Sequence, residues 1–232
     1  MNDDPDKPKP AKLGRRMPGT PTTSTRAVLL DALGTLVELE PPWVHLAPQL
    51  EMEPADVAPA VRAEMDFYKE HAHEGRDEES LAALRKRCAD ILSWELDREV
   101  SVETMLAAIR FRAFDDARPT LDSLRKSGMR LICVSNWDAS LPEVLVRCGL
   151  GDALDGIVTS AKSGHKKPDP AIFLAALELA GCGADEAIHV GDTVAEDIAG
   201  AAAAGIRALH LDRSGGGDIS SLSEVAGAVS GG

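Results

Sequence analysis

The chain has 232 residues, of which 44% are hydrophobic, and it carries a formal net charge of −13. This length is enough to bury one substantial core and a smaller unit, and the acidic balance argues against a nucleic-acid-binding protein, which needs a basic surface. No apolar stretch approaches the roughly 20 residues of a membrane span, so we expect neither nucleic acid nor a membrane among its partners.

Residues 1–26 are rich in proline, lysine, arginine and threonine and contain almost no large apolar side chain. A segment of this composition cannot offset its loss of conformational entropy, so we expect a disordered tail. The apolar run Ala27–Leu30 follows and predicts the first buried strand. Pro41 and Pro42 then end the first strand-and-turn segment, residues 27–42.

The pattern from residue 43 to residue 114 is helical throughout. Apolar residues recur at three- and four-residue spacing over 64–73 and 78–96, with charged residues between them. No convincing strand interrupts this stretch. We therefore expect residues 43–114 to form a helical unit inserted after the first strand.

Strands and helices alternate again over residues 115–213. The expected elements are a helix ending at Lys126, a strand at 131–134, a helix at 141–147, a strand at 156–159, a helix opening at Pro170, a strand at 187–190, a helix at 194–204 and a strand at 207–211. This alternation predicts an α/β fold with a parallel sheet. Residues 214–232 are rich in glycine and serine around one short possible helix, and we expect a flexible C-terminal tail.

Four polar clusters lie beyond apolar runs in this pattern. They are residues 31–35 (DALGT), 135–138 (SNWD), 167–170 (KPDP) and 191–197 (GDTVAED). In an open parallel sheet, the residues just past the carboxyl ends of the strands meet at the ligand site. A carboxylate, a hydroxyl, an ammonium group and an acidic pair are therefore expected to converge, which favours a nucleophile, a phosphate-type clamp and a divalent-cation site.

These clusters, in this order and each after a strand, resemble the motifs of the haloacid dehalogenase (HAD) hydrolase superfamily. The resemblance covers roughly residues 27–212. It implies a Rossmann-like three-layer core, formed by 27–42 and 115–213, with a parallel sheet in the order 5-4-1-2-3 when core strands are numbered along the chain. Residues 43–114 resemble the inserted helical cap of subgroup I.

Asp31 ends the first apolar strand, where a charged group is costly unless it is paired or functional. The resemblance implies that Asp31 is a catalytic nucleophile whose aspartyl-phosphate splits one difficult step into two; an Asp that caps the following turn is the alternative. The second catalytic residue is Lys167, which would place a positive charge against the phosphoryl group and the nucleophile. Its spacing to the following Pro-Asp-Pro favours it over Lys166.

Ser135 and Asn136 are the predicted substrate-binding residues after the second core strand. The resemblance implies that the Ser135 hydroxyl binds a phosphoryl oxygen and that both backbone amides contribute. Thr35 is a third candidate: it either hydrogen-bonds to Asp31 or to the transferring group, or it only forms the turn.

The acidic residues Asp192 and Asp197 predict a metal ion. Two carboxylates near Asp31 would repel one another without a cation, and oxygen ligands with retained waters suit Mg²⁺. The resemblance implies that Mg²⁺ lies between Asp31, the backbone carbonyl of Leu33 and Asp192. Asp197 is then an outer-shell ligand or orients Lys167, unless it is only a charge in the first turn of a helix.

Leu33 departs from the usual phosphatase pattern, in which a second Asp at this position transfers protons. A general acid–base group is typically worth ~10²–10⁴ in rate, and leucine cannot transfer a proton. The leading hypothesis is Mg²⁺-dependent hydrolysis of a small phosphorylated metabolite, with a good leaving group or an acid supplied by the cap. The alternatives are a 2-haloacid dehalogenase, because halide leaves without a proton, and a non-catalytic protein that binds phosphate in the same pocket.

The dehalogenase alternative gains from residues 31–36 (DALGTL) and from the Ser-Asn pair of the second cluster, which resemble that subfamily. It loses because the subfamily usually has Tyr at the position of Leu33 and an Arg soon after the first motif, whereas this chain has no Arg between Arg26 and Arg62. The acidic fourth cluster, typical of a cation site, also favours phosphate chemistry.

The remaining sequence signals concern location and small details. The cysteines show no C-x-x-C spacing, and the N-terminus lacks the apolar run of a signal peptide, so we expect a protein of the reducing cytoplasm. His189 alternates within a strand and is expected to be a core residue. Tyr68, His71 and Arg76 either contact the substrate or lie on an amphipathic helix surface. The sequence identifies neither the substrate nor the oligomeric state.

Overall fold

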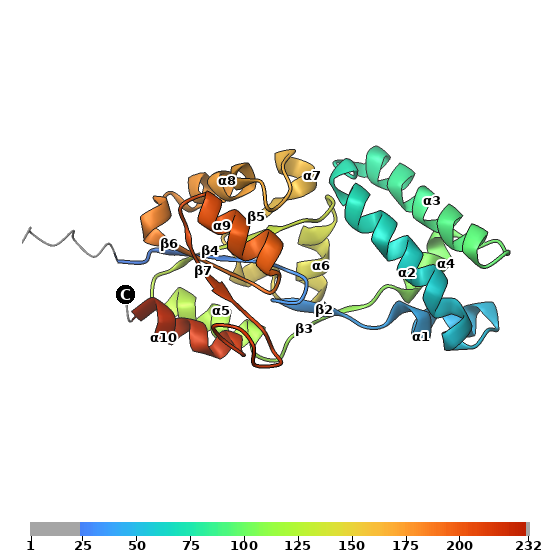
Figure 1. The fold of residues 1–232 in the computed structure, drawn as a ribbon, viewed down its shortest axis with the longest axis horizontal. Coiled ribbons are helices and arrows are strands. Elements are labelled where there is room, and N and C mark those ends of the chain that lie inside the picture. The colour runs from blue at the N-terminus through green and yellow to red at the C-terminus, as the bar shows by residue number, and fades with distance from the viewer. Residues whose placement is uncertain (1–23, 231–232) are drawn as a thin grey trace, which may run out of the picture.

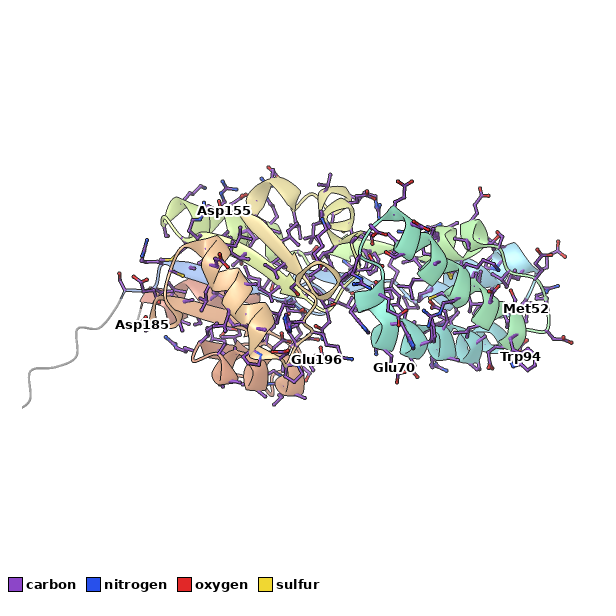
Figure 2. The ribbon with its side chains drawn as sticks, turned by 90° about the horizontal axis from the view of Figure 1, so that it is seen from above. Met52, Glu70, Trp94, Asp155, Asp185 and Glu196 are labelled. Carbon is purple, nitrogen blue, oxygen red and sulfur yellow. The ribbon has the colours of Figure 1, made fainter. Side chains whose placement is uncertain are left out.

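The computed structural model describes residues 24–230. An α/β core and a smaller helical cap lie side by side along the long axis of the molecule (Figure 1). Figure 2 shows Glu196 of the core and Glu70 of the cap near the junction of the two units, and Met52 and Trp94 toward the far end of the cap.

The central sheet has five parallel strands in the order β5-β4-β1-β6-β7. Leu30 lies opposite Cys133 in β4 and Val190 in β6, so the loops after these three strands leave the sheet at one edge. Numbered along the core and read from β7, the order is 5-4-1-2-3, which confirms the prediction. The strands are β1 (Ala27–Leu30), β4 (Arg130–Ser135), β5 (Gly156–Thr159), β6 (Ala187–Gly191) and β7 (Arg207–His210).

Helices cover both faces of this sheet, which confirms the α/β class (Figure 1). Because successive strand residues point to opposite faces, Leu30 packs in one cluster with Leu121, while Leu29 packs in the other with Phe173. All four side chains are fully buried, and such burial is the dominant favourable term in folding. The principal core helices are α5 (Ala117–Lys126), α6 (Leu141–Arg147), α8 (Pro170–Ala180), α9 (Ala199–Ala203) and α10 (Val225–Ser230).

Two helix starts at the site edge of the core differ in kind. Pro170 begins α8 as expected, and the Asp169 side chain accepts a hydrogen bond from the Ala171 amide at 2.9 Å. The helix expected over 194–204 instead starts as a π-helical turn, Val194–Ile198, and continues as α9. π-helical turns are frequent at functional sites, and this one carries Glu196 and Asp197 of the fourth polar cluster.

The cap has its own apolar core, formed by side chains such as Leu46, Val61, Leu84, Leu92 and Met105. Its longest helices begin with recognisable caps: Pro occupies the first turn of α2, and α3 starts with a capping box. The helix expected over 64–73 begins ten residues earlier than the sequence pattern indicated. The cap elements are α1 (Pro42–Leu46), a 3₁₀ turn (Ala47–Leu50), α2 (Pro54–His71), a 3₁₀ turn (Ala72–Glu74), α3 (Glu78–Glu95) and α4 (Val102–Ala108).

A two-stranded antiparallel ribbon joins the cap to the core. It pairs β2 (Val37–Leu39) with β3 (Phe111–Ala113), so the prediction that residues 43–114 contain only helix is wrong at its end. Three-residue strands carry no measurable periodicity, and β3 forms only because a segment distant in sequence lies beside it. The ribbon ties together the two chain segments that cross between the units.

The C-terminal segment also differs from its prediction. Ile219, Leu222 and Val225 are buried in the core cluster, and the Leu222 amide donates a hydrogen bond to Asp116 at 2.9 Å. The prediction of a flexible tail over 214–232 is therefore wrong for most of its described part, because three apolar side chains at three-residue spacing dock against α5. The glycine and serine around them obscured this signal.

Two further predictions concern the N-terminal segment and membrane-spanning helices. Most of the predicted disordered tail, 1–26, lies outside the described residues, but the Arg26 amide donates a hydrogen bond to the Glu186 carbonyl at 2.7 Å. Within residues 24–230, no helix combines the length and the apolar character that crossing a membrane requires.

Candidate active site

Polar side chains from four segments meet at the carboxyl edge of the sheet. Asp31 follows β1, Ser135 ends β4, Asp192 follows β6 and Lys167 precedes α8. Asp31, Ser135 and Lys167 are each at least nine-tenths buried, where an ionised group needs a partner. The structure thus brings these predicted site residues together at one edge of the sheet.

Lys167 is the charged centre of this group. Its Nζ donates hydrogen bonds to Asp31 Oδ1 and Asp197 Oδ1, each at 2.6 Å. Burial lowers the pKa of the Lys167 ammonium, but the two carboxylates outweigh burial and the net pKa is raised. Lys167 therefore stays ionised, whereas its sequence rival Lys166 is exposed.

Asp197 is held by three donors. Besides Lys167, the Thr193 amide donates to Oδ2 at 3.0 Å and His189 Nε2 lies 2.8 Å from Oδ1. Burial raises the pKa of the Asp197 carboxyl, but the hydrogen bonds from His189 and Lys167 outweigh it, so the net pKa is lowered. Of the roles considered for Asp197, this arrangement supports the orientation of Lys167.

His189 is a member of the site whose partner the sequence did not reveal. It is fully buried on β6, and its ring packs edge-on against Phe173 with centroids 5.0 Å apart. The expectation of a core residue is correct, but the side chain also braces Asp197. A buried ionisable residue three positions before an acidic cluster was the available signal.

The side chains of Ser135 and Asn136 hydrogen-bond to different parts of the site. Ser135 Oγ donates to Asp31 Oδ1 at 3.1 Å. The Asn136 side chain accepts a hydrogen bond from the Lys167 amide at 2.7 Å and donates to the Lys167 carbonyl at 3.0 Å and to Glu196 at 2.9 Å. Asn136 thus fixes the backbone that carries Lys167, and a phosphoryl contact is left to its backbone amide. Glu196, which was not among the predicted site residues, therefore contacts the same group.

Thr35 is not part of this group. Its side chain is fully buried, and its Oγ1 has no hydrogen-bond partner among residues 24–230. The predicted hydrogen bond to Asp31 is absent from that part of the chain, and Thr35 does not line the pocket described below. Of the two sequence alternatives, the geometry supports the turn-forming one: the Leu36 amide bonds to the Ala32 carbonyl at 2.8 Å.

Asp192 lies against the loop that follows Asp31. A Cβ at Gly34 would come within 2.1 Å of Asp192 Oδ2, and Gly34 has a φ of +86°, so both close approach and backbone conformation require glycine. Burial, followed by repulsion from Asp31 and Asp197, raises the pKa of the Asp192 carboxyl to about 6. Burial also raises the pKa of Asp31, while Lys167 opposes that rise.

The three acidic side chains fit a hard divalent cation. Asp31, Asp192 and Asp197 each offer a carboxylate oxygen, and these oxygens lie within 4.8 Å of one another. Lys167 is the one ammonium group that hydrogen-bonds to them within residues 24–230, so the cluster keeps excess negative charge. An all-oxygen donor set with unbalanced charge suits Mg²⁺. The Leu33 carbonyl remains a predicted ligand.

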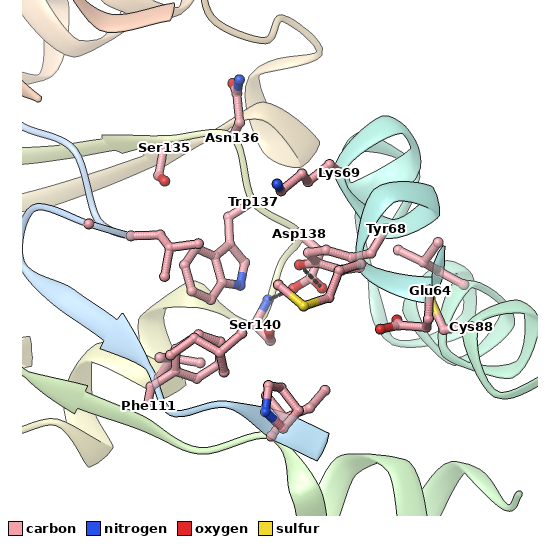
Figure 3. Close-up of a pocket in the computed structure, with 18 of the residues that line it drawn as sticks. Glu64, Tyr68, Lys69, Cys88, Phe111, Ser135, Asn136, Trp137, Asp138 and Ser140 are labelled. Carbon is pink, nitrogen blue, oxygen red and sulfur yellow. Dashed lines mark hydrogen bonds between the residues drawn. The ribbon is translucent and has the colours of Figure 1, made fainter. Parts of the chain in front are cut away.

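A pocket of about 800 Å³ lies between this cluster and the cap. Figure 3 shows Ser135 and Asn136 on its core side and Glu64 and Cys88 on its cap side. Leu33 lines the pocket beside Asp31 and is 37% exposed. The site is thus an acidic centre at one end of a chamber that the cap completes.

This fold and site agree with comparisons to known proteins. The family model of haloacid dehalogenase-like hydrolases matches residues 25–205. The chain therefore belongs to the haloacid dehalogenase-like hydrolase family, as the motif resemblance predicted.

The curated relatives include a haloacid dehalogenase-like domain protein and a phosphatase. The chain is 40% identical over 103 residues to haloacid dehalogenase-like hydrolase domain-containing protein 3 of Danio rerio, covering 44% of this chain and 43% of that protein. It is 33% identical over 120 residues to a phosphoserine phosphatase of Thermus thermophilus, covering 51% and 48%. The matches thus span less than half the length of these curated relatives.

Among solved structures, a 2-haloacid dehalogenase from Pseudomonas syringae pv. Tomato superposes with a TM-score of 0.63. The two chains are 27% identical, and the match covers 89% of this chain and 98% of the other. Core and cap are therefore both shared with this structure.

Proposed function

We propose that this protein is a Mg²⁺-dependent phosphohydrolase that acts on a small phosphorylated metabolite through an aspartyl-phosphate at Asp31. The observation that carries the proposal is the buried hydrogen-bonded chain of Asp31, Lys167 and Asp197. Asp192 packs against the loop that follows Asp31. A retained acidic cluster is useful for a dianionic phosphate and has no purpose in halide displacement. The relationship to a phosphoserine phosphatase gives further support.

The residues of the core divide the reaction between them. Lys167 and Ser135 hold Asp31 through Oδ1, so its carboxylate attacks phosphorus from a fixed orientation while the bond to the leaving oxygen breaks. Water then attacks the aspartyl-phosphate, releasing inorganic phosphate and restoring the carboxylate. Bound Mg²⁺, held by Asp31, Asp192 and the Leu33 carbonyl, would neutralise charge on the phosphoryl oxygens.

Leu33 sets the proton requirement of the first step. Its side chain reaches the pocket but donates no proton to the leaving oxygen. Aryl and acyl phosphates leave as weaker bases than alkyl phosphates and need less help. We therefore expect the enzyme to favour esters with good leaving groups.

The decisive test compares Asp31→Asn with wild type on p-nitrophenyl phosphate at saturating Mg²⁺. We expect Asp31→Asn to abolish turnover, and Asp90→Asn, which changes an exposed cap residue, to keep it. BeF₃⁻ with Mg²⁺ is expected to bind wild type as an aspartyl-phosphate mimic. Substantial activity in Asp31→Asn would rule out the proposal.

The second candidate, 2-haloacid dehalogenation, is favoured by the structural match to the Pseudomonas syringae enzyme and by Leu33. The two functions make opposite predictions about the cation. Chloride release from 2-chloropropionate without Mg²⁺, and no phosphate release with it, would identify the dehalogenase. Neither activity, with phosphate still bound, would identify a non-catalytic protein.

A further inference from the structure

The cap side of the pocket contains a buried carboxyl group that the proposed mechanism does not use. Glu64, on α2, is 7% exposed and lines the pocket. Around it the pocket wall is apolar, with side chains that include Val61, Met65, Leu84, Leu92 and Met105. A carboxyl group in such a wall is costly unless something binds it.

The partners of Glu64 are too weak to account for it. The Cys88 thiol donates a hydrogen bond to its carboxyl, and a thiol is a weak donor for a group with up to four acceptor positions. Within residues 24–230, Glu64 forms no ion pair with Lys, Arg or His. Burial raises the pKa of the Glu64 carboxyl, as expected for a charge without a cation beside it.

A second carboxyl lies in the same part of the pocket. Asp138 is 4% exposed and accepts hydrogen bonds from the Tyr68 hydroxyl at 2.8 Å and from the Ser140 amide at 2.7 Å. Across the described chain it too lacks a basic partner. Figure 3 places Glu64, Tyr68 and Asp138 together, so a carboxyl of the cap and a carboxyl of the core loop after β4 lie at the same end of the pocket.

The basic side chains of the pocket do not fill this gap. Lys69 is exposed, and Figure 3 shows its ammonium end extending toward the core side rather than toward Glu64. Arg85 lines the pocket from α3 but forms no ion pair with either carboxyl in residues 24–230. Arg147 and Lys166 also line the pocket, and within residues 24–230 they too form no ion pair with either carboxyl. A cation that pairs with Glu64 would therefore come from outside the protein.

We propose that Glu64 determines specificity by binding a protonated amine on the leaving group of the substrate, so that the enzyme prefers phosphate esters of apolar amino-alcohols or amino-phenols. The inference rests on the proposed phosphohydrolase function. The phosphoryl group lies at Asp31, the apolar body of the leaving group fills the cap chamber, and its ammonium group meets Glu64 with Asp138 nearby. In this low-dielectric setting the charge pair is much stronger than in water.

The test uses three aryl phosphates of similar size and leaving-group basicity: para-(aminoethyl)phenyl, para-(hydroxyethyl)phenyl and para-ethylphenyl phosphate. Wild type is expected to favour the amine over the ethyl ester in kcat/KM by about 10- to 100-fold, the worth of a charge-assisted hydrogen bond. Glu64→Gln is expected to bring that ratio close to one. The matched control Asp66→Asn, an exposed carboxyl on the same helix, is expected to keep the wild-type ratio.

The comparison uses the ratio of kcat/KM for the amine ester to kcat/KM for the ethyl ester within each variant. This ratio is unaffected by differences between variants in folded fraction or overall rate. A wild-type ratio near one, with all three esters hydrolysed, would overturn the amine proposal and leave the phosphohydrolase intact. Equal preference for the hydroxyethyl ester would also overturn it, since a neutral donor would then suffice. An unchanged ratio in Glu64→Gln would show that another residue binds the amine.

A binding measurement keeps the inference testable if no ester is hydrolysed. Calorimetric titration of wild type with para-(aminoethyl)phenol and para-ethylphenol needs no turnover. Tighter binding of the amine, lost in Glu64→Gln, would support amine recognition by Glu64, while the absence of hydrolysis would overturn the proposed function separately. Equal binding of the two phenols would overturn it.

Discussion

The core and cap sides of the pocket treat buried charge in opposite ways. On the core side, Lys167 bridges Asp31 and Asp197 at 2.6 Å each. On the cap side, Glu64 has only the Cys88 thiol and no basic partner among the described residues. The core thus pairs its buried charges within the chain, whereas the proposed partner of Glu64 is an ammonium group of the substrate.

Removing the central cation of the core is expected to have the largest effect. Lys167→Met leaves two carboxylates buried without their ammonium partner, so we expect a loss of about 3–5 kcal/mol in the free energy of unfolding. Activity on p-nitrophenyl phosphate is expected to fall by about 10²–10³-fold or more. Denaturant unfolding and steady-state kinetics measure the two effects.

The control for this prediction is Lys166→Met, which removes an exposed neighbour. Its unfolding free energy is expected to stay within about 0.5 kcal/mol of wild type. If both variants unfolded alike, the bridge between Asp31 and Asp197 would not be the stabilising feature that its geometry indicates.

Giving the core a proton donor is expected to change the preference between leaving groups. In wild type, p-nitrophenyl phosphate should be hydrolysed far faster than an alkyl phosphate of similar size. Leu33→Asp should narrow that gap by up to the ~10²–10⁴ that a general acid contributes. Rates are compared at saturating Mg²⁺, because the new carboxylate also changes metal binding. Equal wild-type rates on both esters would show that another group already donates the proton.

Because Glu64 is buried and has no basic partner among the described residues, we predict a specific pH dependence of the free energy of unfolding. Burial raises the folded-state pKa of Glu64 above its ordinary value of 4.5, so the unfolded state loses its proton first as pH rises. Between the unfolded and folded pKa values, Glu64 therefore makes wild type progressively less stable. Glu64→Gln removes this ionisation. The free energy of unfolding of Glu64→Gln, relative to that of wild type, should therefore rise as pH rises between the two pKa values.

Denaturant unfolding of both proteins at several pH values below and above 4.5 checks this prediction. Asp66→Asn, which changes an exposed carboxyl on the same helix, is the matched control. A stability difference between Glu64→Gln and wild type that does not vary with pH would mean that Glu64 is not perturbed by burial.

The smallest expected effect concerns the side-chain hydroxyl of Thr35. Thr35 Oγ1 is buried and unsatisfied within residues 24–230. Thr35→Val keeps the shape and removes the hydroxyl, so we expect unchanged or higher stability, by up to about 1 kcal/mol. Activity on p-nitrophenyl phosphate is expected to stay within about twofold. A large loss of activity would restore the substrate-binding role considered for Thr35.

Much of the core follows from local sequence patterns. Apolar runs such as Ala27–Leu30 and 131–134 predict buried parallel strands, and parallel strands bring the residues at their carboxyl ends to one edge. For this reason the convergence of Asp31, Ser135 and Lys167 was predictable from the order of strands and polar clusters along the chain. The sheet order required one step more, the resemblance to a known family.

Tertiary structure alone decided the features that depend on distant partners. The β2–β3 ribbon and the docking of Leu222 arise from short segments whose own patterns do not show which distant segment they pair with or pack against. Likewise, His189 and Asn136 acquire their functions from a particular acceptor or backbone across the site. The sequence determined which residues lie at the end of each strand, because burial and periodicity are local. Only the fold determined that Asp197 has a basic side chain beside it and that Glu64 has none among the described residues. Ion pairs depend on distances between segments that lie far apart in the chain.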